Sequence, residues 1–309
     1  MKTRHLGLDL GGTSIKVALI EGSATGFEAT RTDQRDTQAW RGPAAVVGNL
    51  IAAARSAIES DGPVASVGLG VPGLFETETG EVVLFPNLPG EWNGFPLRKT
   101  MERALGVAVW MINDARAFTL AEGTMGAGAG YRTVVCMTLG TGVGGGIMID
   151  GRLHLGAFGV AGELGHQTID PGGRWCGCGN RGCVEAMARA DVLVELSGKD
   201  SAEEVYATAA TGDVESIAAI HVVAAYLGIG LANVVTLLGP DRIVIGGEIV
   251  EAGDLVLGPI REAVRARVTL VPTDLIEVVP ASLGTSAGAF GAALAGLFRP
   301  GSAPGSHRE

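Results

Sequence analysis

Hydrophobic positions early in the chain fall into two short runs separated by a turn. Residues 4–18 contain these runs with Gly11-Gly12-Thr13-Ser14 between them, a pattern that predicts a β-hairpin. A second pair of apolar runs, at residues 134–139 and 145–149, flanks a glycine-rich turn at residues 140–144 and predicts a second hairpin. Because the pattern recurs near the start of each half of the chain, we expect two related α/β lobes that face one another across a nucleotide.

The remaining apolar spacing predicts alternating strands and helices. Strands are expected at residues 64–71, 107–112 and 242–245, and helices at residues 44–59, 97–105, 115–123, 186–232, 255–267 and 286–297. The longest uncharged stretch, residues 278–298, is long enough to span a bilayer but consists largely of Ala, Gly, Ser and Thr. We therefore interpret it as a glycine-rich buried helix.

The length of the chain, 309 residues, is about that of two domains of ~150 residues each. Hydrophobic residues make up 47% of the sequence and charged residues 18%, as is typical of a folded globular protein. We expect a smaller N-terminal lobe over residues 1–115, with residues 290–300 packing back on it, and a larger C-terminal lobe over residues 116–289. Residues 301–309 are expected to form a disordered tail.

The formal charge of -10 argues against a nucleic-acid partner, because binding to a phosphate backbone needs clustered Lys and Arg. The first 19 residues are interrupted by charges such as Lys2, Arg4 and Asp9, so no signal-peptide pattern is present there. We therefore expect a cytoplasmic protein that binds neither nucleic acid nor a membrane.

The first glycine-rich turn has the composition of a phosphate-binding loop. Its glycines let backbone N–H groups approach a phosphate, and neighbouring side chains add further donors. Asp9 could hold magnesium through water. The donors of this turn are Gly11, Gly12, Thr13 and Lys16, and those of the second turn are Gly140, Thr141 and Gly142. An ordinary hairpin turn is the competing interpretation, but two such turns, one in each half, favour a nucleotide site.

Asp114 is the candidate general base. It follows a predicted strand directly, beside Asn113, and a carboxylate there can accept the proton of an attacking hydroxyl while Asn113 orients a sugar. The competing interpretation is helix N-capping, because Asp is a preferred cap before a helix such as the one expected at residues 115–123.

Three cysteines and a histidine lie close together within the glycine-rich stretch of residues 165–183. The set is His166, Cys176, Cys178 and Cys183, which suits tetrahedral zinc at a closed structural site in the C-terminal lobe. Reduced surface thiols beside an unrelated histidine are the alternative. Cys136, alone in an apolar run, is expected in the core.

Two acidic residues bracket this cysteine-rich loop. If zinc orders the loop, Glu163 and Glu185 could both accept hydrogen bonds from sugar hydroxyls. Each could equally be a solvated surface acid, since Glu is mostly exposed in proteins.

These residues together resemble the ROK family, which comprises repressors, open reading frames and kinases, and above all its bacterial ATP-dependent glucokinases. The resemblance covers nearly the whole chain. The segments that carry it are Leu8-Asp9-Leu10-Gly11-Gly12-Thr13, Pro86-Asn87-Leu88, Asn113-Asp114-Ala115, Leu139-Gly140-Thr141-Gly142, Gly162-Glu163-Leu164-Gly165-His166, Cys176-Gly177-Cys178-Gly179-Asn180-Arg181-Gly182-Cys183-Val184-Glu185 and Ile245-Gly246-Gly247.

The resemblance implies a two-lobed α/β fold of the actin-like ATPase (ribonuclease H-like) type with the active site in the interdomain cleft. It implies phosphorylation of a hexose by ATP with magnesium, by default glucose to glucose 6-phosphate, and a homodimer or homotetramer. Another hexose, an N-acetylhexosamine or a cyclic polyol such as inositol is the alternative acceptor. Implied roles are Asp114 as base, Asn87, Asn113, Glu163, His166 and Glu185 around the sugar, and Gly246 and Gly247 near the nucleotide.

His166 would then serve both zinc and sugar, one ring nitrogen for each. The sequence departs from the family pattern at Arg116, where the kinases usually carry Asn, and at Glu248, where a third glycine is usual. Met187 also stands where glucokinases often have an aromatic residue nearby.

Two other functions compete with a kinase. A ROK-type repressor places a winged helix-turn-helix ahead of the kinase-like region, whereas here the first motif begins at Asp9, so we expect no DNA-binding domain. A non-catalytic sugar-binding protein would be expected to lose Asp114 or the first glycine turn, and both are present.

Overall fold

The computed structural model describes residues 2–23 and 26–299. The expected tail at residues 301–309 lies outside this description. The contacts divide the chain into two compact units. The N-terminal unit comprises the described residues of Met1–Ala121, Ala157–Gly159 and Leu283–Glu309, and the C-terminal unit comprises Glu122–Gly156 and Val160–Ser282.

The N-terminal unit is built on a five-stranded sheet in the order β3-β2-β1-β4-β7. The predicted first hairpin is confirmed as β1 (Thr3–Leu10) and β2 (Ser14–Ser23), and β3 (Gly26–Asp36) extends it antiparallel. On the other side of β1, β4 (Ser66–Val71) and β7 (Val109–Asn113) are parallel to it. The carboxyl ends of β1, β4 and β7 therefore meet at one edge of the sheet.

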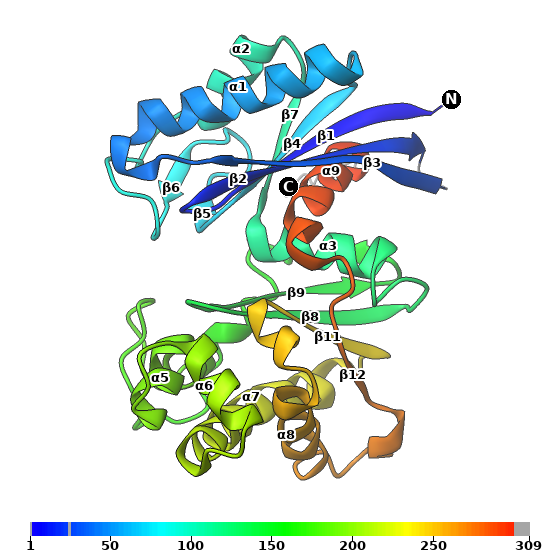
Figure 1. The fold of residues 1–309 in the computed structure, drawn as a ribbon. Coiled ribbons are helices and arrows are strands. Elements are labelled where there is room, and N and C mark those ends of the chain that lie inside the picture. Colours follow the sequence, from blue (N-terminus) through cyan, green and yellow to red (C-terminus); the bar gives the residue numbers. More distant parts are fainter. Residues whose placement is uncertain (1, 24–25, 300–309) are drawn as a thin grey trace. The chain divides into compact units, whose positions relative to one another are not determined.

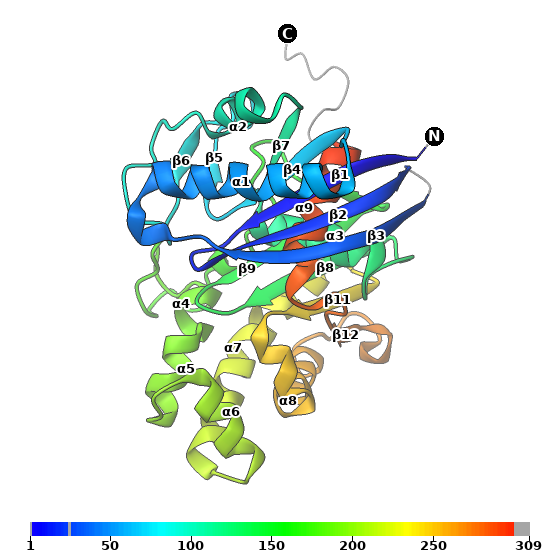
Figure 2. The same ribbon diagram turned by 45° about the horizontal axis from the view of Figure 1, so that its top comes forward.

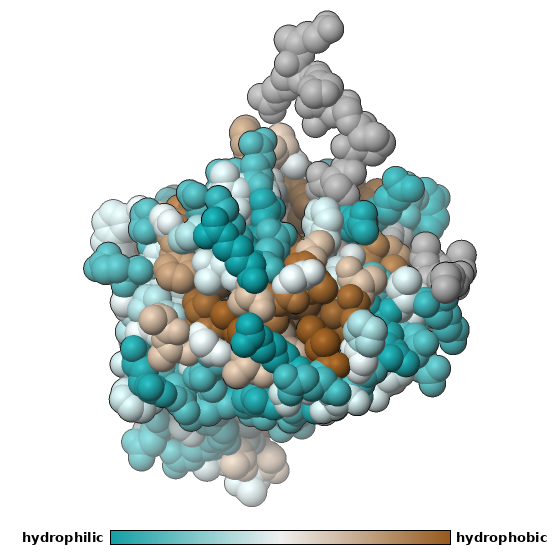
Figure 3. Space-filling model, turned by 90° about the horizontal axis from the view of Figure 1, so that it is seen from above, coloured by the Kyte–Doolittle hydropathy of each residue, from teal (hydrophilic) through white to brown (hydrophobic). Residues whose placement is uncertain are grey.

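Helices cover both faces of this sheet (Figure 1). One face carries α1 and α2, and the other carries α9 and the first part of α3. Their bounds, with those of the short elements of this unit, are η1 (Ala39–Arg41), α1 (Pro43–Asp61), β5 (Leu74–Phe75), β6 (Val82–Leu84), α2 (Leu97–Leu105), α3 (Asp114–Met125), η5 (Gly284–Ser286) and α9 (Ala287–Phe298). Figure 3 shows the molecule from above, with a group of hydrophobic residues among hydrophilic ones on the face in view.

Helix α9 lies so close to the sheet that glycine is required at the contact. A Cβ added to Gly7 on β1 would lie 1.9 Å from the carbonyl oxygen of Ala289, and one added to Gly68 on β4 would lie 1.6 Å from that of Ala292. Gly7 and Gly68 therefore allow the helix to pack directly on the sheet. The abundance of Gly and Ala near the C-terminus reflects this close approach.

The C-terminal unit repeats the same strand order, β10-β9-β8-β11-β12 (Figure 2). The second predicted hairpin is confirmed as β8 (Thr133–Leu139) and β9 (Val143–Ile149), extended by β10 (Arg152–Leu153). β11 (Arg242–Gly246) is parallel to β8, and β12 (Glu277–Pro280) is parallel to β11. Two related α/β lobes, as predicted, make up the fold.

The helical part of this unit is η2 (Leu164–His166), α4 (Val184–Ala188), α5 (Ala190–Ser197), α6 (Ala202–Ala210), α7 (Val214–Leu238), η3 (Glu248–Ala252), α8 (Asp254–Arg265) and η4 (Thr273–Leu275). By length and composition, α7 could cross a membrane. It packs against α4, α5, α6 and α8, and residues such as Leu227 and Leu231 are buried. Its apolar character is that of a core helix.

Three sequence expectations need correction. Residues 278–298 are not one helix, because this stretch begins within β12 and becomes helical at η5 and α9. The expected helical stretch 186–232 is divided among α4 to α7, with Gly198 ending α5 in a left-handed conformation and α7 continuing to Leu238. β3 was not predicted because this edge strand has no buried residue and so lacks an apolar alternation.

Candidate active site and metal centre

The first glycine turn joins β1 to β2 and is held by hydrogen bonds within the turn and from Thr37. The N–H of Gly11 donates to the carbonyl of Ser14 at 2.9 Å. Buried Thr37 donates its hydroxyl to the carbonyl of Gly11 at 2.7 Å and its N–H to the carbonyl of Thr13 at 2.9 Å. Gly12 and Thr13 remain exposed on the turn. Thr37 was missed by the sequence reasoning because it follows the unpredicted strand β3.

Asp9 lies near the end of β1, and its carboxylate is surrounded by backbone. A Cβ on Gly288, in the first turn of α9, would lie 2.4 Å from Asp9 Oδ2. The pKa of Asp9 is raised to about 6, first by burial and then by the nearby negative charge of Asp114, while Lys16 opposes the shift. Lys16 is the cross-strand partner of Asp9 in the hairpin. A cation bound at Asp9 would therefore relieve an existing electrostatic cost.

Asp114 reaches the same edge of the sheet from another strand. Asp9 pairs with Gly70 of β4, and Gly70 pairs with Ile112 of β7, which ends one residue before Asp114. Two carboxylates distant in sequence thus lie within electrostatic range of each other. Such an arrangement of acids is typical of a site that handles protons or a metal ion.

Asn113 fixes the turn that presents Asp114. Its Oδ1 accepts hydrogen bonds from the N–H groups of Ala115 at 3.1 Å and Arg116 at 3.3 Å, and its Nδ2 donates to the carbonyl of Gly73 at 3.2 Å. Asn113 therefore caps α3, the role that the competing interpretation gave to Asp114. Oδ1 of Asp114 accepts the adjacent N–H of Ala115 at 2.8 Å.

Two more sequence candidates belong to the N-terminal unit. Asn87 is exposed in the loop after β6, and its carbonyl oxygen would lie 3.4 Å from a Cβ on Gly12, so this loop borders the first turn. Arg116, the departure from the family pattern, is 3% exposed. A charged side chain so deeply placed, two residues from Asp114, belongs to the interior and not to the solvated surface.

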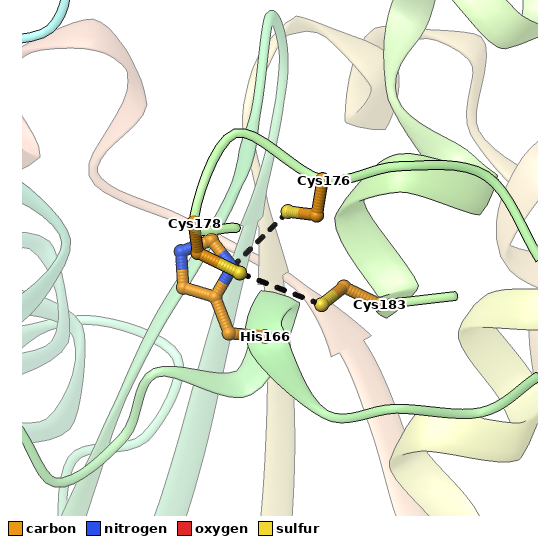
Figure 4. A group of neighbouring side chains, drawn as sticks. All are labelled: His166, Cys176, Cys178 and Cys183. Atoms are coloured by element: carbon orange, nitrogen blue, oxygen red, sulfur yellow. Dashed lines mark hydrogen bonds between the residues drawn. The ribbon is translucent and has the colours of Figure 1, made fainter. Parts of the chain in front are cut away.

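The cysteine-rich loop brings its four candidate ligands together (Figure 4). One ligand atom from each of His166, Cys176, Cys178 and Cys183 lies within 4.8 Å of all the others. Cys178 Sγ and Cys183 Sγ are 3.7 Å apart, and Cys176 Sγ and His166 Nδ1 are 3.5 Å apart. Cys136 is fully buried in β8, as predicted.

These separations fit one tetrahedral ion. With Zn–S distances of about 2.3 Å and a Zn–N distance of about 2.0 Å, tetrahedral angles place two sulfurs about 3.8 Å apart and a sulfur and nitrogen about 3.5 Å apart. The described sulfur and nitrogen atoms match both values. The donor set of three thiols and one imidazole fits structural zinc.

Backbone hydrogen bonds shape the loop around the four ligands. The N–H of Cys176 donates to the carbonyl of Asn180 at 2.8 Å, and the N–H of Gly179 donates to the carbonyl of Cys176 at 3.0 Å. Gly182 has a φ of +63°, and a Cβ there would lie 1.5 Å from the carbonyl oxygen of Asp170. Gly182, and Gly179 with a φ of +89°, are thus needed for the path of the chain.

The local environment acts differently on the thiols. A backbone N–H from Asn180 lowers the pKa of Cys178, whereas burial raises the pKa of Cys176. Burial and the neighbouring thiols raise the pKa of Cys183 to about 12. Metal binding must displace the thiol protons, so the ion and the folded loop depend on each other.

The other ring nitrogen of His166 points away from the cysteines. His166 Nε2 lies 3.9 Å from Glu163 Oε2, and both side chains are about one-third exposed, at 33% and 35%. Nδ1 can therefore bind a metal while Nε2 remains accessible to a ligand that enters from solvent beside Glu163.

Glu185 is engaged by the protein itself and is not a solvated surface acid. Its Oε2 accepts the N–H of Val143 at 3.0 Å, and its Oε1 lies 3.6 Å from the Cys176 thiol. Val143 begins β9 at the end of the second glycine turn, so Glu185 joins that turn to the metal loop.

The second glycine turn is enclosed by several other close contacts. The N–H of Ala190 donates to the carbonyl of Gly140 at 3.2 Å. A Cβ on Gly247 would lie 1.9 Å from the carbonyl oxygen of Leu139. Gly246 pairs with Thr138 at the end of β8, so the Gly246-Gly247 segment lies directly beside the turn. The side chain of Glu248 is outside the described part of the chain.

Known proteins are similar to this chain in sequence and in structure. The family description "ROK family" matches residues 5–297. A glucokinase from Thermotoga maritima is 34% identical over 94% of this chain and 96% of its own length. The structure of a ROK family glucokinase from Streptomyces griseus in complex with glucose and AMPPNP is 31% identical, with a TM-score of 0.81 over 95% of this chain and 99% of that one. A xylose repressor from Bacillus subtilis is 32% identical over 73% of this chain and 59% of its own length.

Proposed function

The chain belongs to the ROK family, and on this premise we propose that it is an ATP-dependent sugar kinase. The proposed reaction transfers the γ-phosphoryl group of ATP to a hydroxyl of a hexose, with glucose to glucose 6-phosphate as the favoured case. The similarity to glucokinases over nearly the full chain supports this choice of sugar.

One observation carries the proposal. Asp9 and Asp114 lie at the same edge of the N-terminal sheet, close enough for the charge of Asp114 to raise the pKa of Asp9. A kinase needs both a carboxylate near the metal-bound phosphates and a second carboxylate that receives the acceptor's proton. The sheet supplies this pair beside a glycine turn.

In the proposed mechanism, Asp114 accepts the proton of the attacking sugar hydroxyl as its oxygen bonds to the γ-phosphorus and the bond to the β-phosphate oxygen breaks. Asn113 holds the turn so that Asp114 is presented to the substrate. The turn amides, Thr13 and Lys16 would contact phosphate oxygens, and Asp9 would hold magnesium through water. Magnesium bound with ATP would neutralise part of the phosphate charge.

The sugar would be held by groups that its hydroxyls can reach. We propose that His166 Nε2, Glu163, Glu185, Asn87 and Asn113 take part in hydroxyl recognition, as the family resemblance implies. Zinc at the four-ligand cluster would be structural, since it would fix the tautomer and direction of the His166 ring. On the nucleotide side, Gly140, Thr141, Gly142, Gly246 and Gly247 would form the second binding segment.

Other acceptors are the alternative within this proposal. Arg116 and Glu248 depart from the family pattern, and a buried Arg116 close to Asp114 could change which hexose, N-acetylhexosamine or inositol is accepted. A repressor or sugar-binding role is the second candidate function, because a xylose repressor shares 32% identity with this chain. We further propose a cytoplasmic location and a homodimeric or homotetrameric state.

The test is ADP release with magnesium and ATP over a panel of glucose, mannose, fructose, allose, N-acetylhexosamines and inositols, with polyphosphate as a second donor. Turnover with one acceptor, lost by at least about a thousandfold in Asp114→Ala, would support the kinase and the base. Near-normal turnover in that variant would overturn the role of Asp114. Sugar binding without turnover across the panel would favour the binding role.

A further inference from the structure

The metal loop and the second glycine turn share a boundary within the C-terminal unit. Val143, at the end of the turn, is contacted from two sides by segments that flank the metal ligands. On one side Glu185, two residues after Cys183, accepts the Val143 N–H at 3.0 Å. On the other side a Cβ on Gly165, the residue before His166, would lie 1.9 Å from the Val143 carbonyl oxygen.

The start of the turn is also held by this part of the chain. The N–H of Ala190, the first residue of α5, donates to the carbonyl of Gly140 at 3.2 Å. A Cβ on Gly142 would lie 2.6 Å from Glu185 Oε2. Gly142 and Val143, at the end of the turn, therefore lie directly against the Glu185 carboxylate.

We propose that Glu185 is a positioning residue for the nucleotide, through which the metal loop holds the second glycine turn in its binding conformation. This inference rests on the proposed function, since it takes the turn to be a nucleotide-binding segment. On this inference the metal loop would have two functions. It would orient His166 toward a sugar, and it would also control the affinity for ADP and ATP.

The physical argument is one of pre-organisation. A glycine-rich turn loses much conformational freedom when it closes on a phosphate, and a partner that fixes it beforehand lowers that entropic cost. The Val143 N–H faces a carboxylate, and hydrogen bonds to charged groups are stronger than neutral ones. Folding of the loop around a metal would fix Cys183 and hence the start of α4, where Glu185 lies.

Two substitutions separate this role from sugar binding. Glu185→Ala removes the acceptor for Val143, and we expect ADP with magnesium to bind about tenfold more weakly. Glu185→Gln keeps an oxygen that can accept the Val143 N–H, so its ADP affinity should stay within about threefold of the wild type, although it too should lose sugar affinity. Glu195→Ala, which breaks only an exposed pair with Arg174, is the matched control and should change neither affinity.

Reciprocal linkage provides a test that does not depend on turnover. If the metal loop holds the turn, removal of zinc should weaken ADP binding, and ADP should raise the affinity for zinc by the same factor, measured by equilibrium competition with a chromogenic chelator. Hydrogen exchange at the Val143 amide should become faster in Glu185→Ala and in metal-free protein, but not in Glu195→Ala.

The outcomes are distinguishable. ADP binding that is equal in the wild type, Glu185→Ala and metal-free protein would overturn the inference and leave the proposed kinase function standing. Failure of the wild type to bind ADP with magnesium would overturn the proposed function and the inference with it. Recovery of ADP affinity in Glu185→Gln, but not in Glu185→Ala, would support the positioning role, because a general loss of stability would not follow that order.

Discussion

The carboxylate of Glu122 accepts hydrogen bonds from the backbone N–H of Ser282, at 3.0 Å from Oε1 and 3.2 Å from Oε2. The chain first enters the C-terminal unit at Glu122 and leaves it for the last time at Ser282. One fully buried side chain thus joins the first and last residues of this unit. It also accepts the N–H of Ala127 at 2.8 Å, which fixes the end of α3.

Replacement of Glu122 should therefore destabilise the protein strongly. Glu122→Ala removes a fully buried side chain and leaves the N–H groups of Ser282 and Ala127 without this acceptor, and we expect a loss of about 2–4 kcal/mol in the free energy of unfolding. Glu122→Gln should lose less, because one acceptor oxygen remains. Denaturant unfolding checks both, with exposed Glu59→Ala as the control that should stay within about 0.5 kcal/mol of the wild type. If Glu122→Ala and Glu122→Gln had the same free energy of unfolding as the wild type and Glu59→Ala, the structural role of Glu122 would be contradicted.

Asp9 should make the stability depend on pH in a defined direction. Its pKa is raised from 3.8 to about 6, so the folded state retains a proton that the unfolded state has lost between these values. Stability from this group is present below pH 4 and is lost as the pH rises through about 6.

Asp9→Asn removes the ionisable group, and we expect its Tm to exceed that of the wild type at pH 8 by about 2–5 °C, with little difference at pH 4. The exposed Asp274→Asn is the control and should show no such pH dependence. A Tm for Asp9→Asn that is unchanged or lower at pH 8 would mean that other groups already compensate the Asp9 charge. Activity should be lost in Asp9→Asn if Asp9 holds magnesium.

The close approach of α9 to the sheet predicts opposite effects for two glycine-to-alanine changes. Gly68→Ala places a methyl group 1.6 Å from the backbone oxygen of Ala292, which must move, so we expect the variant to lose about 3 kcal/mol or more. Gly48→Ala, in the interior of α1 with nothing within 4 Å, should gain about 0.5–1 kcal/mol. Thermal or denaturant unfolding measures both, and a stable Gly68→Ala would show that the helix can shift freely.

Removal of the metal should weaken sugar binding. Without an ion the His166 ring loses the constraint on Nδ1, so Nε2 and Glu163 would no longer be held for a sugar hydroxyl, and we expect affinity for the preferred sugar to fall by about tenfold or more. Cys178→Ala should lose the metal, as measured by elemental analysis. Cys136→Ala, in the core of β8, should retain it. Unchanged sugar affinity in verified metal-free protein would refute the coupling.

Local patterns in the sequence were sufficient for much of the fold. Both hairpins, the strand before Asp114 and most helices follow from apolar spacing and glycine turns, because these depend on steric limits within a few residues. The four residues of the candidate metal site could also be identified, since His166 and the three cysteines lie within 18 residues of one another and their types suit zinc.

Tertiary structure alone decided which distant groups meet. The repulsion between Asp9 and Asp114 depends on β4 lying between β1 and β7, and the bond from Val143 to Glu185 spans 42 residues. The partner of Glu122 lies 160 residues away, and Gly68 is constrained by a helix near the other end of the chain. These contacts depend on strand register and on the packing of whole elements, which periodicity within one segment cannot specify.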